Sequence, residues 1–115
     1  MKWFKQEEDV PPPLVHCLVC GYATLSHRGV FEICPVCFWE DDGESGPAGG
    51  PNGSLDLTDG RNNFAKMGAT EERLLPYVRP PEDDELVKGL PLAAEIKARQ
   101  TAARNKHGYK KESPS

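Results

Sequence analysis

The stretch CLVCGYATLSHRGVFEICPVCFW, residues 17–39, decides the fold of this 115-residue chain. It contains all four cysteines, arranged as two CxxC pairs, Cys17 with Cys20 and Cys34 with Cys37. Two residues between thiolates permit a tight turn whose backbone amides point at the first sulfur. Two such turns that face each other make a tetrahedral site, so the spacing predicts that all four cysteines bind one metal ion.

Four thiolates favour zinc, and a closed shell of four cysteines leaves no open position for water or substrate. We therefore expect one structural zinc ion per chain, which would substitute for part of the core of a small domain. Iron suits the same tetrahedral sulfur geometry, and the cysteines could instead form a redox-active CxxC or stay unpaired. His16 could replace one cysteine as a ligand, although a histidine beside a cysteine is more often an ordinary surface residue.

The residues between the two cysteine pairs predict a β-hairpin. Short strands are expected at residues 22–25 and 30–33, with the sequence SHRG at residues 26–29 as the turn between them. Together with both cysteine pairs, this hairpin would form a zinc-ribbon-like unit over residues 14–42. A Gly/Pro-rich connecting loop follows it.

Two short helices are expected after that loop. Ser54 can cap the first helix, which would run to Met67 and place Leu57, Phe64 and Met67 on one face. Gly68 is suited to end this helix in the left-handed conformation. The second helix, over residues 71–75, is expected to be capped by Thr70 and limited in length by Pro76.

A third helix is expected from Pro91 to about Arg104, a segment rich in alanine. Because it lacks a broad apolar stripe, we expect it to be weakly attached and only partly formed. Residues 105–115 are expected to be a disordered basic end. The whole chain thus predicts a small α+β protein, with a zinc-ribbon-like hairpin followed by two to three short helices.

The predicted organisation has three parts: an extended arm at residues 1–13, a zinc-binding domain at residues 14–80, and a C-terminal helix with a flexible tail at residues 81–115. The N-terminal sequence MKWFKQEEDV has acids where a signal peptide needs an apolar run, and no stretch reaches the roughly 20 apolar residues of a membrane helix. We expect a cytoplasmic protein, in whose reducing surroundings clustered cysteines bind metal more often than they form disulfides.

In these motifs the chain resembles the bacterial cysteine-rich CPCC family, over roughly residues 14–80. The resemblance rests on CLVCGY at 17–22, EICPVCFWEDDG at 32–43, SLDLTDGRNNF at 54–64, Gly68-Ala69 and Tyr77-Val78-Arg79. Where the name-giving motif of the family reads Cys-Pro-Cys-Cys, this chain keeps the outer cysteines, Cys17 and Cys20, and lacks the inner one. The resemblance implies a small zinc-ribbon protein and suggests a bacterial toxin as a candidate partner, because some relatives resemble immunity or accessory proteins.

The first functional hypothesis is a protein-interaction module. Its partner-binding patch would consist of Trp39, Glu40, Asp41 and Asp42, because aromatic side chains supply contact area and carboxylates steer a cationic partner. A structural interpretation of the same residues competes with this one. An aromatic residue directly after a cysteine pair often packs against the metal site, and acids beside a Gly-rich loop are often only solvated.

The second hypothesis is nucleic-acid binding through the basic segment at residues 104–111. The net charge of −4 divides unevenly, with an acidic body at residues 1–85 and a basic end at residues 86–115. Because nucleic-acid binding depends on neutralising phosphates, the acidic body counts against this hypothesis. Catalysis is not expected, since the sequence has no HExxH site, phosphate-binding loop or serine-histidine-acid pattern.

Overall fold

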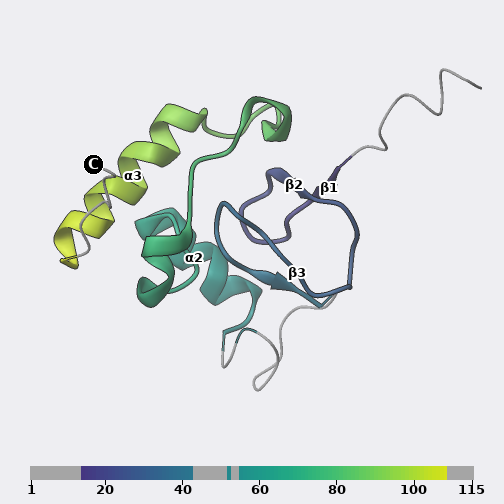
Figure 1. Cartoon of the computed structure of the whole chain (residues 1–115), viewed down its shortest axis with the longest axis horizontal. Coiled ribbons are helices and arrows are strands. Elements are labelled where there is room, and N and C mark those ends of the chain that lie inside the picture. The colour runs from purple at the N-terminus through teal and green to yellow at the C-terminus, as the bar shows by residue number, and fades with distance from the viewer. Residues whose placement is uncertain (1–13, 43–51, 53–54, 109–115) are drawn as a thin grey trace, which may run out of the picture.

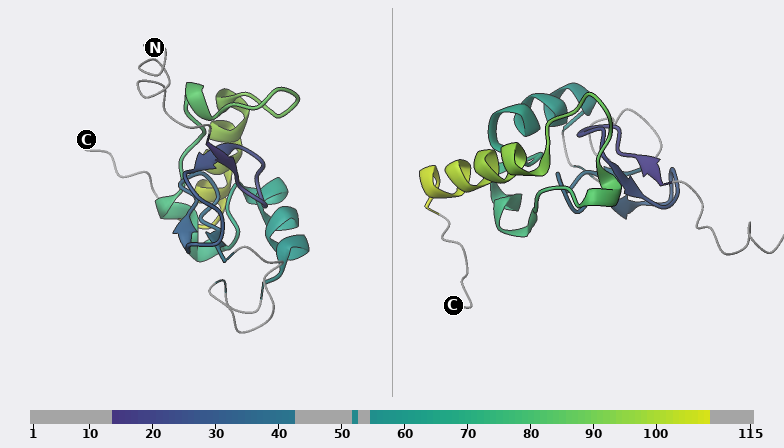
Figure 2. Two further views of the ribbon diagram at one scale, coloured as in Figure 1. Left: turned by 90° about the vertical axis from the view of Figure 1, so that its right-hand side faces the viewer. Right: turned by 90° about the horizontal axis from the view of Figure 1, so that it is seen from above.

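The structure, a computed structural model, describes residues 14–42, Asn52 and residues 55–108. Two small hairpins lie at one end and the two longer helices toward the other (Figures 1 and 2). The elements in chain order are β1 (Val15–His16), β2 (Ala23–Leu25), β3 (Glu32–Ile33), β4 (Glu40–Asp41), α2 (Leu57–Met67), the 3₁₀ helices η1 (Glu72–Tyr77) and η2 (Asp83–Glu85), and α3 (Ala93–Lys106). The predicted small α+β class with zinc-ribbon-like hairpins is confirmed.

Each cysteine pair has a hairpin of its own. Strand β1 pairs antiparallel with β2 on either side of the first pair, and β3 pairs antiparallel with β4 on either side of the second. The predicted pairing of residues 22–25 with residues 30–33 is therefore wrong, although β2 and β3 lie within those segments. The reason is that a CxxC turn reverses the chain by itself, so the strand before each pair meets the strand after it.

Helix α2 starts at Leu57 because a capping box precedes it. The Asp56 carboxylate accepts a hydrogen bond from the Asp59 amide at 2.8 Å, and the Asp59 carboxylate accepts one from the Asp56 amide at 3.2 Å. These two acids satisfy free amides and lie where the helix dipole favours negative charge. The predicted cap, Ser54, lies outside the described residues. The predicted end is confirmed, since Gly68 adopts a φ of 82°.

The apolar face predicted for α2 is confirmed. Phe64 is buried, while Leu57 and Met67 are half-buried and pack against two different apolar clusters. Gly60 also lies on the inner side of the helix. A Cβ at this glycine would come within 3.1 Å of Val19 and 3.3 Å of the Trp39 ring, so its missing side chain lets the helix approach the first hairpin closely.

The predicted helix at residues 71–75 is a 3₁₀ helix, η1, and Thr70 does not cap it. No side-chain hydrogen bond caps η1, whose N-cap residue is Glu71. Both the amide and the hydroxyl of Thr70 instead donate to the carbonyl of Cys37, at 3.0 and 3.2 Å. The cap prediction is wrong because a buried acceptor at the second cysteine pair takes the hydroxyl.

Helix α3 is held firmly, so the prediction of weak attachment is wrong. The side-chain amide of the fully buried Gln100 lies within hydrogen-bonding distance of three carbonyls, those of Val36 (3.1 Å), Gly68 (3.0 Å) and Arg79 (3.2 Å). Hydrogen bonds from a polar side chain do not appear in the spacing of apolar residues, so this attachment could not be predicted from the apolar pattern. The predicted disorder from residue 105 onward is also wrong for Lys106, where the helix ends, whereas residues 109–115 lie outside the described part.

The segment between η1 and α3 is fixed by an ion pair. Arg79 donates to both carboxylate oxygens of Glu85, each at 2.9 Å, and its backbone amide donates to the carbonyl of Pro35 at 3.2 Å. Burial alone would raise the pKa of the Glu85 carboxyl, but the hydrogen bonds from Arg79 and from the Glu82 amide lower it below its ordinary value.

The predicted domain boundary at residues 80–81 stays a prediction. Among the described residues, no helix combines the length and apolarity needed to cross a membrane.

Replacing Gly68 with alanine should lower the free energy of unfolding of the metal-loaded protein by at least about 2 kcal/mol. A left-handed residue that carries a Cβ costs roughly 1–2 kcal/mol. The new Cβ would also collide with Cγ of Gln100, and overpacking of this kind costs about 1–3 kcal/mol. Urea denaturation followed by circular dichroism measures the loss.

The matched control is Gly89→Ala. Gly89 has a φ of 94°, and a Cβ there would have no atom within 4 Å. This variant should therefore lose only the conformational contribution. Equal losses in the two variants would contradict the close packing of Gln100 against Gly68.

Candidate metal centre

The four cysteine sulfurs meet between the two hairpins. The Sγ atoms of Cys17 and Cys37 are 3.6 Å apart, those of Cys20 and Cys34 are 3.7 Å apart, and all four lie within 4.8 Å of one another. A tetrahedral metal with sulfur ligands at about 2.3 Å holds its sulfurs about 3.8 Å apart. All four side chains are buried and none forms a disulfide. The residues therefore fit one metal ion bound by four thiolates.

The backbone supports the first sulfur of each pair in the same way. The Val19 amide points at Sγ of Cys17, and the Val36 amide points at Sγ of Cys34, both at 3.4 Å. Amides directed at a sulfur stabilise its negative charge. We call these two turns the first knuckle (residues 17–22) and the second knuckle (residues 34–39).

Both knuckles close with a residue in the left-handed conformation. In the first knuckle this residue is Gly21, with a φ of 85°, and its amide donates to the Cys17 carbonyl at 2.9 Å. In the second knuckle it is Phe38, with a φ of 72°, and its amide donates to the Cys34 carbonyl at 2.8 Å. Glycine adopts this conformation freely, whereas for a bulky residue it is a costly exception of roughly 1–2 kcal/mol.

The last residue of each knuckle is an aromatic residue that is completely buried. The carbonyl of Tyr22 accepts a hydrogen bond from the Cys17 amide, and the carbonyl of Trp39 accepts one from the Cys34 amide, both at 2.9 Å. Both side chains are 0% exposed. Trp39, which the sequence placed in a partner-binding patch, thus packs inside the fold beside the metal centre and helix α2.

The three acids predicted for the same patch divide between interior and surface. Asp41 is 0% exposed, and Oδ2 of its carboxylate forms an ion pair with Arg28 at 2.7 Å. Glu40 and Asp42 are half-buried at the surface. The ion pair of Asp41 ties the loop before β3 to β4. The partner-binding role of these residues stays a prediction.

Thr24 is a contact of the metal centre that sequence reasoning missed. Its hydroxyl lies 3.1 Å from Sγ of Cys34, and the residue is buried. A hydroxyl beside a thiolate donates a hydrogen bond to it and spreads its charge. The sequence gives one signal: Thr24 lies two residues after the first knuckle, as Asp41 lies two residues after the second. That spacing alone does not indicate a contact with sulfur.

Without a bound metal, the four clustered thiols shift one another's pKa values. Burial raises the pKa of Cys34, but hydrogen bonds from the other three thiols and from the Thr24 hydroxyl lower it well below its ordinary value. Burial, and then hydrogen bonds with the other thiols, raise the pKa of Cys37 well above its ordinary value. One buried thiolate therefore makes a second one unfavourable, and a bound cation supplies the charge that several thiolates need.

Each knuckle is also tied to the helices by its own carbonyl groups. In the second knuckle, three consecutive carbonyls each accept from a different segment: Pro35 from Arg79, Val36 from Gln100, and Cys37 from Thr70. In the first knuckle, the Leu18 carbonyl accepts from Nε of Arg61 at 2.9 Å. His16, the alternative ligand, is exposed and outside the group of four cysteines.

The sequence profile of the cysteine-rich CPCC family matches residues 15–85. This chain belongs to the cysteine-rich CPCC family. Comparisons with curated proteins and with solved structures gave no match. By the resemblance described above, the inner cysteine of the CPCC motif would correspond to Val19, which is buried and lies where a Cβ at Gly60 would touch it. That position packs against α2, so the four-cysteine centre does not depend on it.

Replacing Cys34 with serine should remove the bound metal and most of the native secondary structure. Structural four-ligand sites contribute apparent binding energies of about 10–16 kcal/mol, more than a domain of this size has in total stability. Metal analysis of the purified protein and circular dichroism measure both effects. His16→Ser is the control and should retain metal and fold. A folded, metal-free Cys34→Ser protein would refute a structural metal.

Replacing Thr24 with valine should weaken metal binding by about tenfold or more while the protein remains folded, because groups that orient metal ligands typically contribute 10–100-fold in affinity. Competition with a chelator of known affinity measures the change. Thr24→Ser keeps the hydroxyl and should bind metal nearly as well as the wild type. If the valine variant held the metal as tightly as the serine variant, the hydrogen bond to Cys34 would have no part in binding.

Proposed function

We propose that this chain is a zinc-stabilised protein-interaction module. Zinc is the metal that best suits four thiolates in a tetrahedron without a redox role. Because four cysteines complete the coordination shell, the metal has no position for a substrate, and we propose a structural role rather than catalysis.

The observation that carries this proposal is a group of exposed apolar side chains around the second knuckle. Phe31 is 57% exposed, Ile33 is 42% exposed and Tyr77 is 64% exposed. The ring of Tyr77 packs on the ring of Phe38, with centroids 5.6 Å apart. Aromatic and branched side chains gathered at one part of a surface mark protein interfaces.

The charge of the body supports a cationic partner. Acidic side chains outnumber basic ones by more than two to one over residues 1–85. Long-range attraction by such a surface speeds association with a basic protein. A bacterial toxin with a basic active site is the partner that the family resemblance suggested, and we retain it as the candidate to test.

Nucleic-acid binding is the weaker proposal, because two arginines of α3 make internal contacts. Arg104 donates from Nε to the Leu75 carbonyl at 2.8 Å and also bonds the Val78 carbonyl. Arg99 lies over the ring of Phe64, 5.7 Å from its centroid. Guanidinium groups held in this way contribute little to a phosphate-binding surface.

Affinity purification of the tagged protein from its native host tests the proposal, with Cys34→Ser as the control. We expect one protein in stoichiometric amount that is basic at neutral pH and is lost in the control. Mass spectrometry identifies it, and treatment with nuclease should not release it. Recovery of only nuclease-sensitive DNA- or RNA-bound proteins would instead favour nucleic-acid binding.

A further inference from the structure

Two phenylalanines adopt a backbone conformation that favours glycine. Phe31 has a φ of 65° and Phe38 a φ of 72°, and no other non-glycine residue in the described part of the chain has a positive φ. Phe31 directly precedes β3, and Phe38 closes the second knuckle. Phe31 therefore lies at the open end of the β3–β4 hairpin, where its amide donates to the Asp41 carbonyl at 2.8 Å, and Phe38 lies in the turn at the other end.

A positive φ does not require a phenylalanine at either place, although the ring of Phe38 also packs against the apolar cluster that contains Ala69 and Leu75. The first knuckle closes its equivalent turn with Gly21, at a φ of 85°. Phe31 is also too exposed, at 57%, for its ring to be an important part of the core. Strained residues of this kind concentrate at functional sites, where the side chain has a use other than stability.

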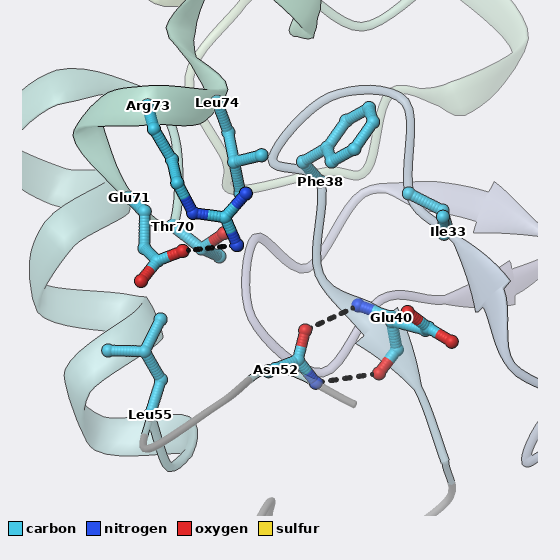
Figure 3. Close-up of a pocket in the computed structure, with 9 residues that line it drawn as sticks. All are labelled: Ile33, Phe38, Glu40, Asn52, Leu55, Thr70, Glu71, Arg73 and Leu74. Atoms are coloured by element: carbon cyan, nitrogen blue, oxygen red, sulfur yellow. Dashed lines mark hydrogen bonds and ion pairs between the residues drawn. The ribbon is translucent and has the colours of Figure 1, made fainter. Parts of the chain in front are cut away.

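A small pocket opens beside Phe38 (Figure 3). Its volume is about 190 Å³. Apolar side chains from β3, the second knuckle, the segment before α2 and η1 form one part of its wall, namely Ile33, Phe38, Leu55 and Leu74. Ile33 in turn lies close to Phe31 along the chain. Tyr77 packs on Phe38, and Phe31 is an exposed ring two residues before Ile33. We call these apolar residues in and beside the pocket the knuckle face (Phe31, Ile33, Phe38, Leu74 and Tyr77).

The polar rim of the pocket carries more negative than positive charge. Glu40 lines it, and its backbone amide and carbonyl both bond the side chain of Asn52 at 2.8 Å (Figure 3). Glu71 lines it as well and pairs with the highly exposed Arg73 at 2.8 Å. After this pairing, the carboxylate of Glu40 leaves the rim with a net negative charge.

We propose that the knuckle face binds a basic segment of a partner protein in which an apolar side chain lies between lysines or arginines. The apolar side chain would enter the pocket between Ile33, Phe38 and Leu74, and the cations would approach Glu40 and Glu71. An apolar anchor in a small pocket surrounded by complementary charge is the usual arrangement of an energetically important contact. This inference rests on the proposed interaction function and specifies its surface and its partner chemistry.

Selection from a library of displayed 12-residue peptides on the metal-loaded full chain tests the inference. We expect enriched peptides to carry an aromatic or branched aliphatic residue flanked by lysine or arginine, and to bind less tightly as salt increases. Ile33→Asp should weaken their binding at least tenfold, as should Phe31→Gly. Leu92→Ser, which removes an apolar side chain that is 67% exposed on another part of the surface, should leave binding unchanged.

Stability measurements on Phe31→Gly separate binding from folding. Because glycine relieves the positive φ and little burial is lost, the urea midpoint of the variant should equal or exceed that of the wild type while its peptide binding falls. A lower midpoint would mean that Phe31 stabilises the fold and would overturn its assignment to binding. Enrichment of acidic peptides, or equal binding by Ile33→Asp and Leu92→Ser, would overturn the knuckle face itself.

Two further outcomes distinguish this inference from the proposed function. A host protein captured equally by the wild type and by Ile33→Asp would leave the interaction function standing and overturn the knuckle face. A concentration-dependent dimer that Ile33→Asp abolishes would assign the face to a second copy of this chain. Residues 2–5 of the chain, KWFK, have the chemistry of the proposed segment. This outcome would overturn the proposal that the face binds a different protein.

Discussion

The meeting of four buried sulfurs between two hairpins is the constraint on which the remaining structure depends. The strands of these hairpins have only two or three residues, and two-stranded ribbons of that length are not stable in water. The close sulfur contacts run from one knuckle to the other, Cys17 to Cys37 and Cys20 to Cys34. A metal ion bound by all four sulfurs would therefore join the two hairpins directly.

The helices and their connecting segments then hold the knuckles from outside. The second knuckle receives hydrogen bonds at three consecutive carbonyls, from Thr70, Arg79 and Gln100, which come from three different segments. The first knuckle touches α2 through the close approach at Gly60. Turn carbonyls cannot all be satisfied within a CxxC turn, so side chains and amides from elsewhere in the chain complete them. The metal centre and the helical part are therefore one structural unit.

The sequence predicted what local chemistry determines and failed where the interaction was distant. The four ligands follow from CxxC spacing, and the end of α2 follows from the freedom of Gly68 at positive φ. Thr70 looks like a helix cap because its hydroxyl is the right group at the right place, but the buried carbonyl of Cys37 competes successfully for it. Gln100 looks like an ordinary surface residue of an alanine-rich helix, since no periodicity marks a glutamine whose side-chain amide lies within hydrogen-bonding distance of three carbonyls.

The same reasoning explains why the partner patch chosen from sequence shifts in the structure. Trp39 and Asp41 have side chains suited to binding, yet both are buried. Trp39 ends the second knuckle, and side chains alternate between the two faces along β4, so Trp39 and Asp41 point inward. Glu40 and Asp42 remain at the surface, and the apolar side chains exposed in the same hairpin, Phe31 and Ile33, precede the second cysteine pair. If the proposed interaction holds, a metal centre without an open coordination position would serve recognition indirectly, because the second knuckle directly follows the strand that carries Ile33.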